Sequence, residues 1–331
     1  MHYLVVDLAN TFFRSRHAAY RSTTIDEKIG MAIHLTLSSI NAMNRRFAPD
    51  HTVICLEGRS WRKDYYEPYK RNRQVTRAEL SPKDMEEEQI FWETYEHLVD
   101  YLREKTCCSV IRCPEAEGDD VIARWIALHP DDNHTIISTD SDFVQLLAEN
   151  VQQYNGMADE LLTVNGILNA NGDIAIDKKT KQPKEPPDPK WALFEKIIRG
   201  DSSDNIFSAY PGVRTKGSKN KVGLVEAYTD RHKQGWSWNN LMLQRWTDHN
   251  GDEHRVLDDY ERNRVLIDLT AQPDHIKASV DSAIVEQAQR ENKDQVGAKF
   301  LKFCGRYSLV KLSEHANQYS TWLNKHYTGH L

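Results

Sequence analysis

The sequence lacks any long apolar run, which excludes a protein that spans a membrane. A transmembrane helix needs roughly 20 consecutive apolar residues, and every apolar run in this 331-residue chain is far shorter. The first residues, MHYLVVDLAN, also lack the basic and then apolar segments of a secretory signal. We therefore expect a cytoplasmic protein with no membrane partner.

Paired cysteines and the common nucleophile motifs are absent as well. An odd number of cysteines without C-x-x-C spacing argues against a disulfide framework or a thiolate zinc site; the five are Cys55, Cys107, Cys108, Cys113 and Cys304. The chain has no G-x-S-x-G elbow, no G-x-x-x-x-G-K-[ST] loop and no H-E-x-x-H pair. These absences leave the carboxylates as candidates for the chemistry.

An excess of positive charge is missing too, because the formal net charge is −6. Taken alone, this balance argues against a nucleic-acid partner. Two segments are nevertheless basic: residues 59–77, RSWRKDYYEPYKRNRQVTR, where aromatic side chains are interleaved with cations, and residues 212–223, GVRTKGSKNKVG, which hold no acid. A solvated loop is the alternative interpretation of each segment.

Both segments suit a nucleic-acid surface. Lysine and arginine neutralise phosphates, and aromatic rings stack on unpaired bases. We therefore expect nucleic acid to contact Arg62, Lys63, Tyr69, Lys70, Arg71, Arg73, Arg214, Lys216, Lys219 and Lys221.

Strand-like segments alternate with helical patterns over the first half of the chain. Strands are predicted at residues 3–6, 52–56, 107–113, 134–138 and 151–155, and helices at 25–47, 81–105, 120–129 and 142–150. Strands separated by helices indicate a parallel sheet with crossover connections. The predicted fold class is therefore α/β, with a twisted, mostly parallel sheet flanked by helices.

The pattern changes after residue 155. Residues 156–189 contain turn signals and the proline-rich KQPKEPPDP, which predict a hairpin insertion and then a linker. From Lys190 onward the sequence is mainly helical, interrupted by the basic segment at 212–223. We expect an α/β core over residues 1–189 and a helical region over residues 190–331.

Acidic side chains recur where predicted strands end. An open parallel sheet gathers the carboxyl ends of its strands at one edge, where ligands bind. Four strands and one later helix are followed by such acids, which are Asp7, Glu57, Glu117, Asp119, Asp120, Asp140, Asp142, Asp201 and Asp204. Helix capping explains any one of them, but it does not require several carboxylates at strand after strand. Glu115 is expected to be a surface acid.

Like charges gathered on one rim destabilise a fold unless cations intervene. Oxygen ligands without histidine or cysteine are typical of Mg²⁺, for which Mn²⁺ can substitute. Two such ions, ~3.5–4 Å apart, would activate a water and stabilise the leaving oxygen in phosphodiester hydrolysis. The pattern therefore predicts a two-metal nuclease site.

Four motifs resemble, in order and spacing, those of the flap endonuclease or 5′-nuclease family. VVDLANTFFR resembles its first metal-binding strand, EAEGDDVIA its E-x-D-D motif, STDSDFVQLL its T-x-D-x-D motif and GDSSDNI its G-D-x-x-D-N signature. The hairpin insertion and the stretch DDYERNRVLIDLTAQPDHI resemble the ribonuclease H branch of T-even phages. The resemblance implies a PIN-like core, a basic arch at residues 59–80 and a DNA-binding, helix-hairpin-helix-like turn at residues 212–223.

The resemblance also implies roles for individual residues. The first, tighter metal site would be formed by Asp7, Glu57, Glu117, Asp119 and Asp120. The second would be formed by Asp140, Asp142, Asp201 and Asp204. Lys70 and Arg73 resemble the cations that steer the scissile phosphate, and loss of Asp120 is expected to abolish catalysis. The chain departs from the family in having Glu57 where an aspartate is usual, and in lacking a G-x-G turn at residues 212–223.

Together these features predict a Mg²⁺-dependent 5′→3′ nuclease of RNA–DNA hybrids and of duplex or 5′-flap DNA, which removes RNA primers during phage DNA replication in the host cytoplasm. Two alternatives stay open: a branched-DNA-binding protein with weakened catalysis, and a PIN-type nuclease of single-stranded RNA. The resemblance adds a single-stranded-DNA-binding protein and a sliding clamp as expected partners of a monomeric enzyme.

Overall fold

The structure is a computed structural model that describes residues 1–19, 24–219 and 221–330. The chain groups into two compact units. Unit 1 comprises Met1–Trp61, Leu80–Pro187 and Asp274–Leu331, and unit 2 comprises Arg62–Glu79 and Asp188–Pro273. The helical region that the sequence predicts from residue 190 is therefore divided, because its last part belongs to unit 1.

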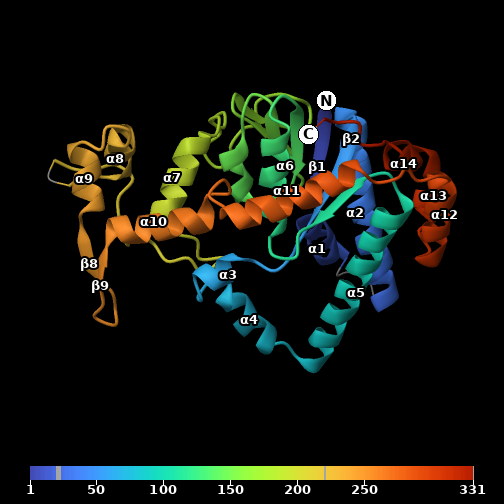
Figure 1. Cartoon of the computed structure of the whole chain (residues 1–331), viewed down its shortest axis with the longest axis horizontal. Coiled ribbons are helices and arrows are strands. Elements are labelled where there is room, and N and C mark those ends of the chain that lie inside the picture. Colours follow the sequence, from blue (N-terminus) through green and yellow to red (C-terminus); the bar gives the residue numbers. More distant parts are fainter. Residues whose placement is uncertain (20–23, 220, 331) are drawn as a thin grey trace. The chain divides into compact units, whose positions relative to one another are not determined.

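A seven-stranded sheet forms the centre of unit 1 (Figure 1). The strand order is β3-β2-β1-β4-β5-β6-β7, in which β1 to β5 are parallel and β6 and β7 are antiparallel. The strands are β1 (His2–Asp7), β2 (His51–Leu56), β3 (Ser109–Arg112), β4 (Asn133–Ile137), β5 (Val151–Asn155), β6 (Glu160–Thr163) and β7 (Gly166–Leu168). The predicted α/β class is confirmed, and the residues after β5 form the predicted hairpin.

Helices cover both faces of this sheet. They are α1 (Leu8–Ala18), α2 (Ile25–Phe47), α5 (Pro82–Lys105), α6 (Gly118–Leu128), α11 (Asp274–Ala288), α12 (Val296–Arg306), α13 (Val310–Glu314) and α14 (Ala316–Leu323). Leu4 and Val6 of β1 join a buried apolar cluster with α1, α2, α5, α12 and α14. On the other face Tyr3 packs against Trp125 of α6, beside which α11 lies (Figure 1).

The helices begin where the sequence places them. Thr24 and Glu27 form a reciprocal capping box at the start of α2, and the Ser81 hydroxyl accepts the Asp84 N–H at the start of α5. Each contact satisfies backbone groups that a helix end would otherwise leave without a partner. None of the described helices has the length and apolarity needed to cross a bilayer.

The helix predicted at residues 142–150 is wrong beyond its first turn. Only the short 3₁₀-helix η2 (Ser141–Leu146) forms there. Leu147 is extended, with φ −61° and ψ 134°, and Ala148 forms a bridge with Val151. The chain turns back at once to pair β5 with β4, and this leaves no room for a longer helix.

Unit 2 is mainly helical. It contains α3 (Arg62–Tyr65), α4 (Arg71–Ala78), α7 (Pro189–Arg199), α8 (Leu224–Asp230), α9 (Trp236–Met242) and α10 (Val256–Ile267). The sequence did not predict its short hairpin, β8 (Arg245–Thr247) and β9 (Glu253–Arg255). One apolar cluster lies around Phe194 and Trp238. A second joins Tyr69 to residues of α7 and α10.

Candidate functional site

The acids of unit 1 lie at the carboxyl edge of the parallel sheet. Asp7 ends β1, Glu57 follows β2, and Asp140 follows β4. Strand β1 pairs with β2 on one side and with β4 on the other, so the strand order changes direction beside β1. Ligands of open α/β sheets bind at such a switch point, and these three acids lie at strand ends on either side of it.

Ser138 links the acid of β1 to the acid that follows β4. The Asp7 carboxylate caps α1 by accepting the Asn10 N–H at 3.0 Å, and it accepts the Ser138 hydroxyl at 2.9 Å. The Ser138 oxygen also accepts the Asp140 N–H at 3.1 Å. Because Ser138 is only 1% exposed, this bridge is shielded from competing water.

Gly58 allows Glu57 to reach the start of α6. The Gly58 N–H donates to the Ala116 carbonyl at 3.0 Å, and a Cβ at this position would lie 2.0 Å from the Cys113 carbonyl oxygen. Any larger residue would therefore push the two segments apart. Glu57 accepts the Gly118 N–H at 3.1 Å, where the helix dipole favours a negative charge.

Glu117 and Asp120 are buried at the same helix start. Their residues are 5% and 0% exposed, while Glu115 is exposed, as predicted. The Asp120 carboxylate accepts the Glu117 N–H and the Trp61 indole N–H, both at 3.1 Å. The bond from the Glu117 N–H is the one that helix capping alone would predict. A cap does not need a fully buried carboxylate, however, because capping side chains are usually exposed.

Neighbouring side chains show that these acids share one environment. Burial raises the pKa of the Cys55 thiol, and the charges of Asp7 and Asp119 raise it further. Burial likewise raises the pKa of the Tyr95 hydroxyl; the charges of Glu57 and Asp7 raise it further, and the charge of Arg112 lowers it. The electrostatic field of at least three carboxylates therefore overlaps at this edge of the sheet.

The carboxylates at this edge accept hydrogen bonds from other groups of the protein. Across residues 1–19, 24–219 and 221–330, no group of three or more histidine, cysteine, aspartate or glutamate side chains is arranged so that it could hold a metal ion. The donors of the edge are all carboxylate oxygens, which suit a hard divalent cation. An ion would have to replace some of the hydrogen bonds described above.

The two remaining predicted ligands, Asp201 and Asp204, belong to unit 2. Gly200, which precedes them, has φ +74°, and a Cβ there would lie 2.4 Å from the Ile206 carbonyl oxygen. Asp201 accepts the Ser203 N–H at 2.8 Å and pairs with Lys196 at 2.7 Å. Burial alone would raise the pKa of Asp201, but bonds from Lys196 and Ser203 lower it to about 2.

The residues predicted to steer the scissile phosphate, Lys70 and Arg73, both contact Asp204. Its carboxylate lies 2.6 Å from the Arg73 guanidinium and 3.6 Å from the Lys70 ammonium, and it accepts the Tyr69 hydroxyl at 3.1 Å. The Asn72 side chain donates to the Ser202 and Ser203 carbonyls. Within unit 2 the GDSSDN loop thus holds the base of the predicted arch.

The aromatic and basic residues of this arch divide into buried and exposed groups. Arg62 is 1% exposed and donates to the Leu266 carbonyl, and Tyr69 is 4% exposed. The prediction that these two side chains are presented to nucleic acid does not agree with their burial. Sequence patterning could not separate them from their neighbours; the exposed members include Lys63, Tyr65, Arg71, Arg73 and Arg77.

The basic turn of unit 2 is built around two glycines and one acid. A Cβ at Gly223 would lie 2.4 Å from the Gly217 nitrogen, so the chain crosses itself there. The Glu226 carboxylate accepts the N–H groups of both glycines at 3.0 and 2.9 Å. A bond from its own backbone N–H lowers the pKa of Glu226 most, and the bonds from the two glycines lower it further. Residue 220 lies outside the described residues, and the predicted cations Arg214, Lys216, Lys219 and Lys221 are all exposed.

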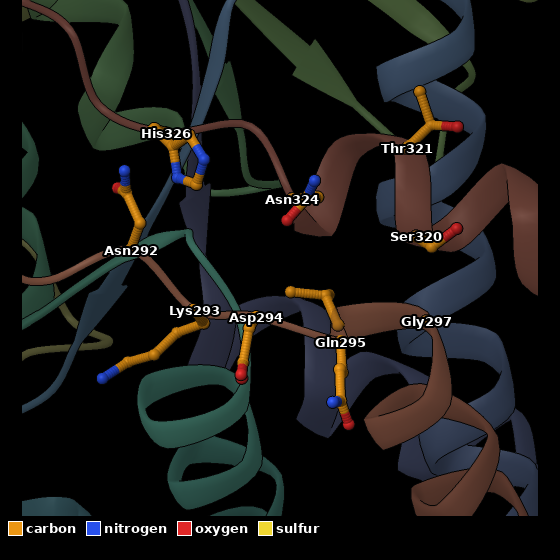
Figure 2. A pocket seen from close by; sticks show the side chains of 10 residues that line it. Asn292, Lys293, Asp294, Gln295, Gly297, Ser320, Thr321, Asn324 and His326 are labelled. Carbon is orange, nitrogen blue, oxygen red and sulfur yellow. The ribbon is translucent and has the colours of Figure 1, made fainter.

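A polar hollow of about 630 Å³ lies elsewhere on unit 1, between the segment before α12 and the end of α14 (Figure 2). Lys293, Ser320 and His326 line it. It is near Cys107, just before β3, since the Cys107 thiol donates to the Lys293 carbonyl. The hollow is therefore at the amino ends of the strands, and none of the sequence motifs falls on it.

Comparison with known proteins gives three kinds of similarity. A family model described as 5′-3′ exonuclease, N-terminal resolvase-like domain, matches residues 2–172. The chain is 27% identical to ribonuclease H of Enterobacteria phage T4 over 275 residues, which cover 77% of each protein. It is 29% identical to DNA polymerase I of Rhizobium leguminosarum over 189 residues, or 55% of this chain and only 15% of the polymerase.

Solved structures share the fold. A bacteriophage T5 flap endonuclease, crystallised with DNA and metal ions, superimposes with a TM-score of 0.59 at 18% identity, covering 88% of this chain and 100% of the phage T5 protein. At 18% identity, the match shows that the two proteins share a fold. It agrees with a resolvase-like or PIN-type arrangement of the sheet and its helices.

Proposed function

Because the chain belongs to the 5′-3′ exonuclease family through its N-terminal resolvase-like domain, we propose that it is a divalent-metal-dependent nuclease that cleaves phosphodiesters near the 5′ ends of nucleic acids. The observation that carries the proposal is the set of carboxylates at the switch point of the sheet, formed by the buried Asp7, Glu117 and Asp120 and the partly exposed Glu57. The similarity to the phage T4 ribonuclease H, which spans 77% of both chains, supports it.

The cofactor in this proposal is Mg²⁺, as two ions that Mn²⁺ can replace. Bound ions would supply an activated water and neutralise the leaving oxygen. Asp7, Glu57, Glu117, Asp119 and Asp120 are proposed for the first site. Asp140, Asp142, Asp201 and Asp204 are proposed for the second. Lys70 and Arg73, which pair with Asp204, would release it and bind the scissile phosphate, because a phosphate is also an anion that accepts their N–H groups.

The proposed substrates are RNA–DNA hybrids and DNA duplexes with a 5′ end or a 5′ flap, and the proposed role is RNA primer removal in phage DNA replication, in the cytoplasm of the host. The exposed cations of the arch and of the basic turn support a nucleic-acid substrate. A monomeric state and contacts with a single-stranded-DNA-binding protein or a sliding clamp stay predictions.

Cleavage of end-labelled substrates tests the proposal. The purified protein should release short products from a 5′-labelled RNA–DNA hybrid and from a 5′-flap duplex in Mg²⁺, and should be inactive in EDTA. Preference for single-stranded RNA would favour the PIN-type ribonuclease. Binding of branched DNA without cleavage, together with a gain of cleavage in Glu57→Asp, would favour the weakened enzyme.

A further inference from the structure

Two tryptophans of unit 2, two residues apart in the sequence, have opposite environments. Trp238 is 8% exposed and belongs to the apolar cluster around Phe194. Trp236, at the start of α9, is 74% exposed, compared with 58% for Phe207 and 51% for Tyr65. A large apolar ring left in water costs free energy that burial would recover, so its position needs an explanation.

The turn that carries Trp236 is well ordered by its own bonds. The Asp230 carboxylate accepts the Trp238 N–H at 3.1 Å, and a Cβ at Gly235 would lie 2.5 Å from this carboxylate. The Asn239 amide donates to the carbonyls of Gln234 and Gly235. Hydrogen bonds therefore hold this turn in a conformation that leaves Trp236 exposed.

The surroundings of Trp236 are basic. Residues 212–236 contain six lysine and arginine residues and two acids, Glu226 and Asp230. Both carboxylates accept backbone N–H groups, while Lys233 and the four cations of the basic turn are exposed. This arrangement leaves a positive surface with one exposed indole, which is the combination found in single-strand-binding sites.

Helix α8 lies between the basic turn and Trp236 in the chain. The turn precedes α8, and the segment with Trp236 follows it (Figure 1). The helix has seven residues and so extends for about 10 Å at 1.5 Å per residue. Phosphates along one strand of a duplex are about 3.4 Å apart along its axis, so this length corresponds to about three nucleotides.

We propose that Trp236 stacks on an unpaired nucleotide next to a duplex whose backbone contacts the basic turn. This inference rests on the proposed function, and it adds a position at which the junction between paired and unpaired nucleotides is recognised. Stacking is independent of base identity because every base has a π-face. The site would therefore recognise the presence of an unpaired nucleotide and not its sequence.

Fluorescence anisotropy in EDTA tests the proposal without cleavage. A labelled blunt duplex is compared with the same duplex carrying a short single-stranded extension at either end. Trp236→Ala should weaken binding of at least one extended duplex by roughly tenfold and leave blunt-duplex binding unchanged, while Trp236→Phe should retain most of the affinity. Leu243→Ala, which removes another exposed side chain of unit 2 (53% exposed), should behave as wild type.

The outcomes separate this inference from the proposed function. If wild type binds no duplex, the proposed function fails. If wild type binds and cleaves but Trp236→Ala binds every duplex equally well, the inference alone is overturned, and the exposed indole is left for a protein partner. An equal loss of affinity for blunt and extended duplexes would also overturn it, because that result indicates a general defect of unit 2.

Discussion

At the residue scale, the acids of the sheet edge depend on neutral neighbours that hold them in place. The Ser138 hydroxyl contacts Asp7 and the Asp140 N–H, and the Trp61 indole donates to Asp120. Ser138 is the first residue of the STDSDFVQLL motif, but the sequence does not show that it contacts Asp7, and Trp61 was expected to belong to the basic arch. Hydrogen bonds of this kind orient metal ligands and contribute to affinity.

Replacement of Ser138 tests this positioning role. Ser138→Ala should lower the affinity for Mn²⁺ roughly 10- to 100-fold, because the Asp7 carboxylate and the backbone N–H of Asp140 both lose their bond to this hydroxyl. Isothermal titration calorimetry measures the effect, with Ser141→Ala as the control, since Ser141 is exposed. Equal Mn²⁺ affinity in the two variants would show that Ser138 does not orient the ligands.

Gly58 offers a second test at this scale. In Gly58→Ala the new Cβ would meet two backbone carbonyls, at 2.0 and 2.6 Å, and backbone atoms cannot move aside cheaply. The free energy of unfolding should fall by about 1–3 kcal/mol, as measured by urea denaturation. Gly305→Ala in α12, whose Cβ would meet nothing within 4 Å, should be neutral or stabilising. Equal stability of the two variants would contradict the close crossing.

At the element scale, the C-terminal segment after α14 is fixed to the amino ends of the strands by histidines. His51 of β2 donates from Nδ1 to the Lys325 carbonyl and accepts the Ser109 N–H at Nε2, so the neutral ring is required. His129 contacts the Tyr327 hydroxyl at 2.7 Å, and His134 contacts the His129 carbonyl. These contacts were invisible in the sequence, where the histidines are scattered.

Because His51 and His134 are buried, we expect the protein to lose stability in acid. Burial lowers the pKa of His51 and of His134 to about 4, below the value near 6.5 of an unfolded chain. The unfolded state therefore binds more protons, and stability present above pH 6.5 is lost as pH falls toward 4. Each histidine should lower the free energy of unfolding by on the order of 2 kcal/mol between pH 7 and pH 5.

Urea denaturation at both pH values measures this change. His134→Asn should have a smaller pH dependence than wild type, whereas His249→Gln, at an exposed position, should keep the wild-type dependence. A wild-type protein equally stable at pH 7 and pH 5 would contradict the argument.

Elements whose signals are local were predictable. The helix at residues 25–47 and the parallel strands follow from periodicity and capping residues. The end of η2 and the β8–β9 hairpin were not predictable, because the pairing of β5 with β4 determines the first and the second has few alternating residues. The sequence likewise placed Asp7 and Glu57 at the ends of strands, but it did not show that Arg62 and Tyr69 are buried.

At the scale of the whole molecule, a net charge of −6 conceals basic surfaces. Lys216, Lys219 and Lys221 are exposed in unit 2, and Lys178, Lys179 and Lys181 are exposed in the hairpin insertion of unit 1. Both triplets carry the same charge. Only the first belongs to the surface proposed to contact a duplex.

The salt dependence of duplex binding separates the two triplets. Each phosphate contact contributes about 0.9 to the slope of log K against log salt. Replacement of Lys216, Lys219 and Lys221 by glutamine should lower this slope by up to about 3, and the same change at Lys178, Lys179 and Lys181 should leave it unchanged. Equal slopes for the two variants would remove the basic turn from the interface.

The central claim is that the carboxylates at the switch point of the sheet support metal-dependent cleavage. The most direct test compares two acids of one short stretch, the buried Asp120 and the exposed Glu115. With a 5′-labelled RNA–DNA hybrid in Mg²⁺, Asp120→Asn should lower the cleavage rate roughly 100-fold or more, while Glu115→Gln should cleave at the wild-type rate. Cleavage by Asp120→Asn at the wild-type rate would contradict the account.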